Sequence, residues 1–230
     1  EPTILDVAPW LLSVEVDQGG GYAVNAQIKA TGIEIETGVY ISGINKDADG
    51  NVVSVSIADS PSEDAEIRTL PADMVVFGAG IRPNDELARD ADLARGERGG
   101  ILVNDACHSS DEHIWAIGEV ACVLGRTWGL VAPANAMADA VAANLLNDNE
   151  EAQVEEFDIA TKLKFSGVQV AGFGDRRGTT EGCLEVLFAD PARGMYQKIV
   201  TSGDAKTLLG GVFVGDTAPF DSLKPLLGRE

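Results

Sequence analysis

The sequence predicts an α/β fold followed by a smaller α+β module. From residue 1 to residue 146, strand-like apolar runs alternate with helical patterns. The run Ala72–Phe77 is almost continuously apolar, which is typical of a strand buried on both faces of a sheet. After residue 157, strand patterns follow one another and end in a short helical segment. These observations separate an α/β region from a C-terminal α+β module.

The first region is expected to hold a helix among several strands. Val14–Ala30 has apolar residues at helical spacing and stops at Thr31 and Gly32. Lys46–Gly50 has the composition of a tight turn and indicates a β-hairpin. The expected strands are Thr3–Val7, Ile33–Thr37, Val39–Ile44, Asn51–Ile57, Ala65–Leu70 and Ala72–Phe77. Residues 1–97 therefore form most of one α/β unit in this interpretation.

A polar, glycine-rich joint at Arg95–Gly100 opens the second region, and an acidic linker at Asn147–Glu156 closes it. Between them we expect an alanine-rich helix at Leu130–Leu146, and near the end of the chain a short helix at Pro219–Leu227. The remaining strands are expected at Ile101–Val103, Ile114–Ile117, Leu163–Phe173, Cys183–Phe188, Met195–Thr201 and Thr207–Val214. Leu208–Val214 is too apolar for an open edge, so we expect the module, a second subunit or another domain to cover it.

Charge and cysteine usage exclude several classes of function. The chain has 17 basic and 37 acidic residues, a net charge of −20, which repels nucleic-acid phosphates and anionic lipids. No stretch approaches the apolar length of a membrane span. We therefore expect neither nucleic acid nor a membrane as a partner. The three cysteines, Cys107, Cys122 and Cys183, have no C-x-x-C spacing, which predicts no metal or redox pair. Their odd number argues against a disulfide framework, so we expect a reducing, cytoplasmic location.

Most ligand-like motifs have a simpler interpretation. Gly19–Gly21 lacks the lysine and the spacing of a phosphate loop and is favoured as a flexible helix entry, and Gly172–Gly174 is similarly weak. Asp47–Asn51 is favoured as a hairpin turn over a calcium loop, because the bidentate glutamate is absent. His108 and His113 lack a second ligand at metal spacing and are interpreted as loop residues. No motif for nucleophilic catalysis is visible, so no catalytic residue is assigned.

Two segments remain candidates for ligand binding. Gly78–Gly80 follows the run Ala72–Phe77 at the carboxyl end of the expected strand, where open α/β sheets bind their ligands. On composition alone, a ligand site and a plain loop are equally supported there. Ile114–Ala121 turns at Gly118 into Glu119, which offers close backbone approach and a carboxylate for a ligand hydroxyl. A strand-ending turn is the alternative interpretation of this segment.

Taken in order, these segments resemble the pyridine nucleotide-disulfide oxidoreductase superfamily. Ala72–Asn84 is similar to its A-D-x-V-V-x-G-x-G-x-R-P-N segment, and Gly99–Asn104 with Ser109–Glu119 is similar to its flavin signature. Within the superfamily, the chain most resembles the flavoprotein part of the large subunit of assimilatory NAD(P)H-dependent nitrite reductase. That resemblance is carried by Thr127–Pro133, by Thr161–Lys164 with Gly167 and Val168, and by Leu208–Asp216.

The resemblance implies a partial two-dinucleotide-binding, Rossmann-like flavoprotein reductase. Residues 1–97 would be the C-terminal portion of the NAD(P)-binding domain, 98–150 the C-terminal portion of the FAD-binding domain, and 151–230 a C-terminal α+β interface module. Both G-x-G-x-x-G fingerprints of the family are absent from these 230 residues. We therefore expect the chain to be a fragment, inactive on its own, and the interface module to carry no catalytic group.

The resemblance also assigns residues to FAD. Glu119 replaces the family's aspartate, whose carboxylate binds the ribityl chain, and Gly118 and Val120 flank it in the same turn. Ala132 and Pro133 would lie near the pyrimidine edge of the flavin ring. No metal ligand is assigned within the chain.

Three further residues are assigned to the nicotinamide dinucleotide by the same resemblance. Asp6 matches the acid at the end of the second strand of the NAD unit, which receives the adenosine ribose hydroxyls. Ala79 and Gly80 would line the same nucleotide from the neighbouring strand end. A carboxylate at Asp6 favours NADH over NADPH, because it repels a 2′-phosphate.

The function implied is electron transfer in nitrate assimilation. The parent protein would take a hydride from NADH onto FAD and pass electrons through a 2Fe-2S cluster to sirohaem, both bound outside these residues, reducing nitrite to ammonia. Downstream cluster and sirohaem domains, a small subunit and a homo-oligomer are the partners that this implies. The alternatives are a ferredoxin- or rubredoxin-type reductase, an NADH oxidase of the same superfamily, or a catalytically silent interaction fragment.

Overall fold

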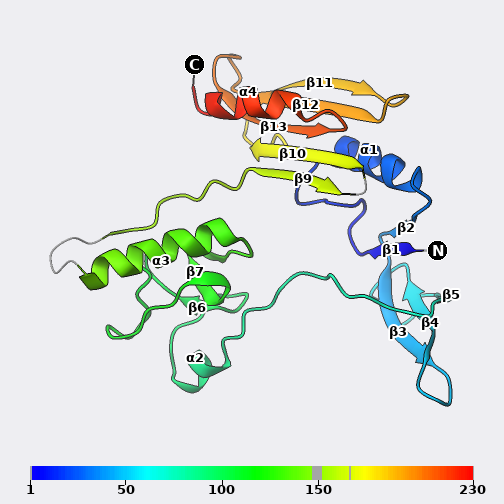
Figure 1. Cartoon of the computed structure of the whole chain (residues 1–230), viewed down its shortest axis with the longest axis horizontal. Coiled ribbons are helices and arrows are strands. Elements are labelled where there is room, and N and C mark those ends of the chain that lie inside the picture. The colour runs from blue at the N-terminus through cyan, green and yellow to red at the C-terminus, as the bar shows by residue number, and fades with distance from the viewer. Residues whose placement is uncertain (1, 147–151, 166, 230) are drawn as a thin grey trace. The chain divides into compact units, whose positions relative to one another are not determined.

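The structure, a computed structural model, describes residues 2–146, 152–165 and 167–229. Contacts divide the chain into two compact units. The first unit joins residues 1–76 to residues 159–230, and the second comprises residues 77–158. Figure 1 shows the helices and strands of both.

A five-stranded antiparallel sheet, in the order β11-β12-β13-β10-β9, is the main layer of the first unit. Its strands are β9 (Thr161–Phe165), β10 (Val168–Gly174), β11 (Leu184–Asp190), β12 (Met195–Thr201) and β13 (Leu208–Val214). The last three confirm the expected strands. The single strand expected over Leu163–Phe173 is wrong, because Gly167, with a φ of +83°, lets the chain reverse and pair β9 with β10.

The central strand β13 is covered on both faces within the unit. Val212 and Val214 pack into a cluster with helix α1 (Gln18–Lys29), whereas Phe213 packs with Phe220 of helix α4 (Ala218–Leu223). Successive side chains of a strand point to opposite faces, so α1 and α4 cover opposite faces of the sheet. Figure 1 shows both helices against this sheet. The short helix expected near the C-terminus is α4, which continues into the 3-10 turn η2 (Lys224–Leu226).

Helix α1 begins four residues later than its apolar spacing predicts. The Asp17 carboxylate accepts a hydrogen bond from the Gly20 N–H at 3.0 Å and caps the helix, so regular structure starts at Gln18. Val14, which was expected inside the helix, lies outside it and is 76% exposed. The buried face of α1 carries Val24 and Ile28, which pack against the sheet.

Two smaller sheets complete the first unit. Strands β1 (Thr3–Asp6) and β2 (Glu34–Thr37) pair in parallel, with Asp6 opposite Thr37. Strands β3 (Tyr40–Lys46), β4 (Val52–Ala58) and β5 (Ile67–Pro71) form an antiparallel meander. The hairpin expected at Lys46–Gly50 is confirmed, and its turn is held by the Asp47 carboxylate, which accepts from the N–H groups of Asp49 and Asn51.

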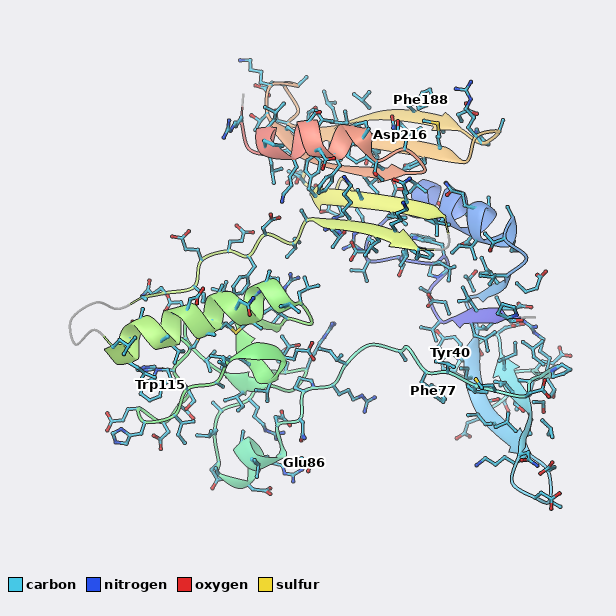
Figure 2. The ribbon with its side chains drawn as sticks, viewed as in Figure 1. Tyr40, Phe77, Glu86, Trp115, Phe188 and Asp216 are labelled. Atoms are coloured by element: carbon cyan, nitrogen blue, oxygen red, sulfur yellow. The ribbon has the colours of Figure 1, made fainter. Side chains whose placement is uncertain are left out.

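The buried strand expected over Ala72–Phe77 is wrong. In the described structure these residues form no strand, and Met74, Val76 and Phe77 are 78%, 83% and 65% exposed. A doubly buried strand needs hydrogen-bonded neighbours and cover on both faces, and this segment pairs with no described strand. Figure 2 labels Phe77 on this irregular segment.

The second unit has short strands and one long helix. Its elements are α2 (Glu86–Asp90), β6 (Ile101–Leu102), the 3-10 turn η1 (Gly118–Val120), β7 (Ala121–Val123), β8 (Arg126–Thr127) and α3 (Val131–Leu146). The helix expected at Leu130–Leu146 is confirmed as α3. The strand expected at Ile114–Ile117 is wrong, because within the described loop Trp115 makes a single bridge to His108. Residues 147–151 of the expected acidic linker lie outside the described residues.

Candidate functional site

The turn assigned to the flavin lies against the long helix of the second unit. Residues Gly118, Glu119 and Val120 form η1, and η1 contacts α3. Gly118 has a φ of +77°, a conformation that glycine adopts without strain, and nothing lies within 4 Å of the position that its Cβ would occupy. The Glu119 side chain is exposed. The turn therefore presents open backbone and a solvent-facing carboxylate beside α3.

A cavity of about 320 Å³ opens at the beginning of α3. Its walls include Ala132, Pro133 and Ala136 from the first turns of the helix and the segment 153–158 that follows it. This volume is at the lower end of ligand pockets, about 300–1,000 Å³, and suits one ring system better than a whole dinucleotide. Two residues assigned to the flavin ring edge, Ala132 and Pro133, thus share a wall of this cavity.

Residues 152–156 were expected to belong to an acidic linker, and the contribution of the segment 153–158 to the cavity was missed. Asn144 of α3 exchanges two hydrogen bonds with the backbone of Ala152, at 2.9 and 2.6 Å, and the Val154 N–H donates to the Asp105 carbonyl at 2.8 Å. The sequence signal that could have found this segment is the pair of apolar residues, Val154 and Phe157, among its acids.

Aromatic packing fixes the far end of the same segment. The rings of Trp128 and Phe157 meet edge to face, 4.8 Å between centroids. The Trp128 indole N–H donates to the Val123 carbonyl at 3.2 Å, and the Arg126 guanidinium lies 3.6 Å from the centroid of the Trp128 ring. Trp128, which the resemblance placed in a family motif, therefore contacts β7, β8 and the cavity wall.

The charges around the cavity favour an uncharged ring of a cofactor over its phosphate groups. The N-terminal end of a 16-residue helix carries partial positive charge, which stabilises a carbonyl oxygen placed there. Glu155, Glu156 and Asp158 also line the cavity, and their carboxylates repel phosphate groups. An uncharged ring with polar carbonyl groups fits these walls better than a pyrophosphate does.

The residues assigned to the nicotinamide dinucleotide fall in different units. Asp6 ends the parallel strand β1 in the first unit, where its Oδ1 accepts from the Ala8 N–H at 2.9 Å. Ala79 and Gly80 belong to the second unit, where both are exposed and Gly80 has a φ of +82°. A half-buried carboxylate at the end of a parallel strand is where dinucleotide folds hold a ribose. The common site of these three residues stays a prediction.

Comparison with known proteins decides the family. Residues 1–143 match the family model described as pyridine nucleotide-disulphide oxidoreductase. The chain belongs to this family. Residues 160–230 match a second model, described as the rubredoxin NAD+ reductase C-terminal domain. The superfamily inferred from the sequence motifs is thereby confirmed.

Among its oxidoreductase relatives, the nitrite reductase large subunits are similar along nearly the whole chain. The "Nitrite reductase [NAD(P)H] large subunit" of Klebsiella oxytoca is 38% identical over 227 residues, covering 99% of this chain and 23% of that protein. The "Nitrite reductase (NADH) large subunit" of Escherichia coli K12 is 36% identical, covering 99% of this chain and 26% of that protein. The chain therefore spans about a quarter of the length of these relatives.

Solved structures confirm the α/β reductase fold of the family. An NAD-dependent persulfide reductase from A. fulgidus has a TM-score of 0.80 at 22% identity, covering 99% of this chain and 44% of that one. A ferredoxin reductase from Rhodopseudomonas palustris has a TM-score of 0.73 at 24% identity, covering 96% of this chain and 52% of that one. Across the described part of the chain, no helix is long and apolar enough to span a membrane.

Proposed function

We propose that this chain is part of the NAD(P)H- and FAD-dependent electron-transfer unit of an assimilatory nitrite reductase. The observation that carries the proposal is identity of 36–38% along 99% of the chain to nitrite reductase large subunits. Residues 1–97, 98–150 and 151–230 would contribute the NAD(P) part, the FAD part and the interface module. A cytoplasmic location, a homo-oligomer and a small partner subunit belong to the same proposal.

The described residues fit part of an FAD molecule. FAD, when bound, accepts a hydride from the nicotinamide and passes electrons on. In this proposal the Glu119 carboxylate accepts hydrogen bonds from ribityl hydroxyls. Gly118, with open space at its Cβ position, lets the backbone of the turn Gly118–Val120 approach the cofactor. Ala132 and Pro133 border the ring edge in the cavity at the beginning of α3. Asp6 accepts hydrogen bonds from the adenosine ribose of the nicotinamide dinucleotide.

The 2Fe-2S cluster and the sirohaem do not fit the described residues. Among these residues, no three His, Cys, Asp or Glu side chains come together as a metal site. Cys107 and Cys122 are buried and Cys183 is partly buried, each as a free thiol. The proposal therefore assigns the ligands of both groups to residues other than these.

The family match of the C-terminal residues favours a second candidate function, electron transfer to a different acceptor. Because residues 160–230 match the rubredoxin NAD+ reductase C-terminal domain, electron transfer to a small iron protein is the alternative. The two functions share NADH oxidation by FAD and differ in the electron acceptor.

The test is an acceptor comparison on the full-length protein, purified with its cofactors. NADH oxidation is measured with ferricyanide, with rubredoxin, with a 2Fe-2S ferredoxin and with nitrite, and ammonia is quantified in the nitrite assay. We expect ferricyanide reduction together with ammonia formation from nitrite. Fast reduction of rubredoxin or ferredoxin without ammonia would establish the alternative, and absence of flavin and of NADH oxidation would reject both.

A further inference from the structure

A buried ammonium group joins two distant segments of the first unit. Lys198 lies on β12 of the C-terminal sheet and is 2% exposed. Its Nζ is 2.7 Å from Oδ2 of Asp17, the residue that caps α1, and 2.8 Å from Oε1 of Glu185 on β11. Removing a charge from water is unfavourable unless oppositely charged partners compensate it. Two carboxylates provide this compensation.

Asp17 uses both of its carboxylate oxygens. Oδ1 accepts from the Gly20 N–H and caps α1, while Oδ2 accepts from Lys198 and, at 2.7 Å, from the Tyr196 hydroxyl. Burial by itself raises the pKa of the Asp17 carboxyl, but hydrogen bonds from Lys198, Tyr196 and Gly20 outweigh burial and hold the pKa below its ordinary value. Asp17 therefore remains a carboxylate and connects the helix to the sheet.

The glycines that open α1 allow the helix to approach this cluster. A Cβ on Gly19 would lie 2.5 Å from Cε2 of Tyr196, and a Cβ on Gly21 would lie 2.2 Å from Cδ1 of Trp10. Gly19–Gly21, which the sequence favoured as a flexible helix entry, is thus a place of close packing. Both Tyr196 and Trp10 belong to the same apolar cluster as the buried face of α1.

The helix held in this way is the one that follows β1. β1 ends at Asp6, α1 begins at Gln18, and the chain then returns to β2, which pairs with β1 in parallel. Near the other end of α1, the Gln27 side chain donates to the Gly194 carbonyl in the turn before β12. The C-terminal sheet therefore contacts the β1–α1–β2 segment at both ends of its helix.

We propose that Lys198 is a positioning residue for nucleotide binding: by holding Asp17, it fixes α1 on the C-terminal sheet and so places β1 and its terminal Asp6 for the ribose. The inference rests on the proposed function, in which Asp6 receives the ribose. It gives the C-terminal sheet, β9 to β13, a role in the affinity for NADH, although this sheet supplies no cofactor-binding residue in the proposal.

The test compares Lys198→Met with a matched control in the full-length flavoprotein. Lys206→Met removes another lysine–aspartate pair of the same module, but Lys206 is exposed, 67%, and pairs with Asp204 at 3.8 Å. For Lys198→Met we expect the KM for NADH and the Kd of NAD+ measured by calorimetry to rise roughly tenfold, as for residues that couple two sites. We expect the kcat measured with ferricyanide, and the FAD content, to stay at the wild-type values. For Lys206→Met we expect KM, Kd, kcat and FAD content all to stay at the wild-type values.

A milder variant keeps the proposal testable if Lys198→Met fails to fold. Tyr196→Phe removes a single hydrogen bond to Asp17 and retains the ring, so we expect a smaller rise in KM and Kd in the same direction. An unchanged Kd in a folded variant would overturn the inference, and so would equal losses of Kd, kcat and FAD content, which indicate general destabilisation. If the wild-type protein itself oxidises no NADH, it is the proposed function that fails.

Discussion

Two apolar runs of this chain look alike in sequence and differ in the structure. Leu208–Val214 becomes the central strand β13, where Val212, Phe213 and Val214 are at most 1% exposed. Ala72–Phe77 forms no strand in the described structure, and Phe77 is 65% exposed. β13 has antiparallel neighbours on both sides, β12 directly before it in the chain and β10 earlier, before β11 and β12. Apolar composition predicts a tendency to be buried, but neighbouring strands decide whether burial occurs.

The same contrast extends to the candidate functional residues. The middle of the C-terminal sheet is covered by α1 and α4, whereas Glu119, Ala79 and Gly80 are exposed. We therefore expect substitutions in the sheet to affect folding and substitutions at the exposed residues to affect cofactor binding. Four predictions test this division.

The largest effect is expected from truncating the buried aromatic. Phe213→Ala should lower the free energy of unfolding by about 3–5 kcal/mol, because it leaves a cavity between the sheet and α4. Phe77→Ala is the matched control and should change stability by less than about 0.5 kcal/mol. Urea unfolding followed by circular dichroism measures both. Equal losses would show that Phe77 is as well packed as Phe213 and would remove the contrast.

The next effect concerns flavin retention. Glu119→Ala in the full-length protein should weaken FAD binding by roughly ten- to a hundredfold, because a hydrogen bond to a charged group contributes about 1.5–3 kcal/mol. Flavin absorbance after dialysis gives the retained fraction. Glu112→Ala, whose side chain is 87% exposed in the preceding loop, should retain its flavin. If both variants keep FAD equally, Glu119 is a turn residue without a role in binding.

A smaller effect is expected on cofactor choice. Asp6→Ser should raise the NADPH-to-NADH ratio of kcat/KM roughly tenfold, because the carboxylate that repels a 2′-phosphate is gone. Asp49→Ser, in the exposed hairpin turn, serves as the control for net charge. Steady-state kinetics with both nucleotides provide the ratio. If the ratio shifts equally in the two variants, the cause is the overall charge of the protein and not a contact between Asp6 and the ribose.

The smallest effect is expected inside the C-terminal module. Cys183 is partly buried as a free thiol just before β11, and we predict that Cys183→Ala leaves both NADH-dependent dye reduction and nitrite reduction unchanged. Val200→Ala, which truncates a fully buried side chain of β12, should lower the melting temperature but not the activity of the folded protein. Loss of dye reduction in Cys183→Ala with folding and flavin intact would show that the module takes part in the chemistry.

The sequence by itself determined the local elements and the family. Alternation and turn chemistry predicted the β3–β4 hairpin, the alanine-rich α3 and the strands β11, β12 and β13, because side-chain period and turn residues act within a few positions of one another. The ordered motifs from Ala72 to Asp216 indicated the oxidoreductase family without any structure, and the family model confirms it.

Only the tertiary structure decided which segments are buried, which strands pair and which distant residues are in contact. It left Met74, Val76 and Phe77 exposed, split Leu163–Phe173 into two strands, and placed the segment 153–158 on the cavity at α3. It also showed that Gly19–Gly21, expected to be a flexible helix entry, packs closely against Tyr196 and Trp10. Each of these outcomes depends on residues far apart in the chain, whose packing and hydrogen bonding no local pattern contains.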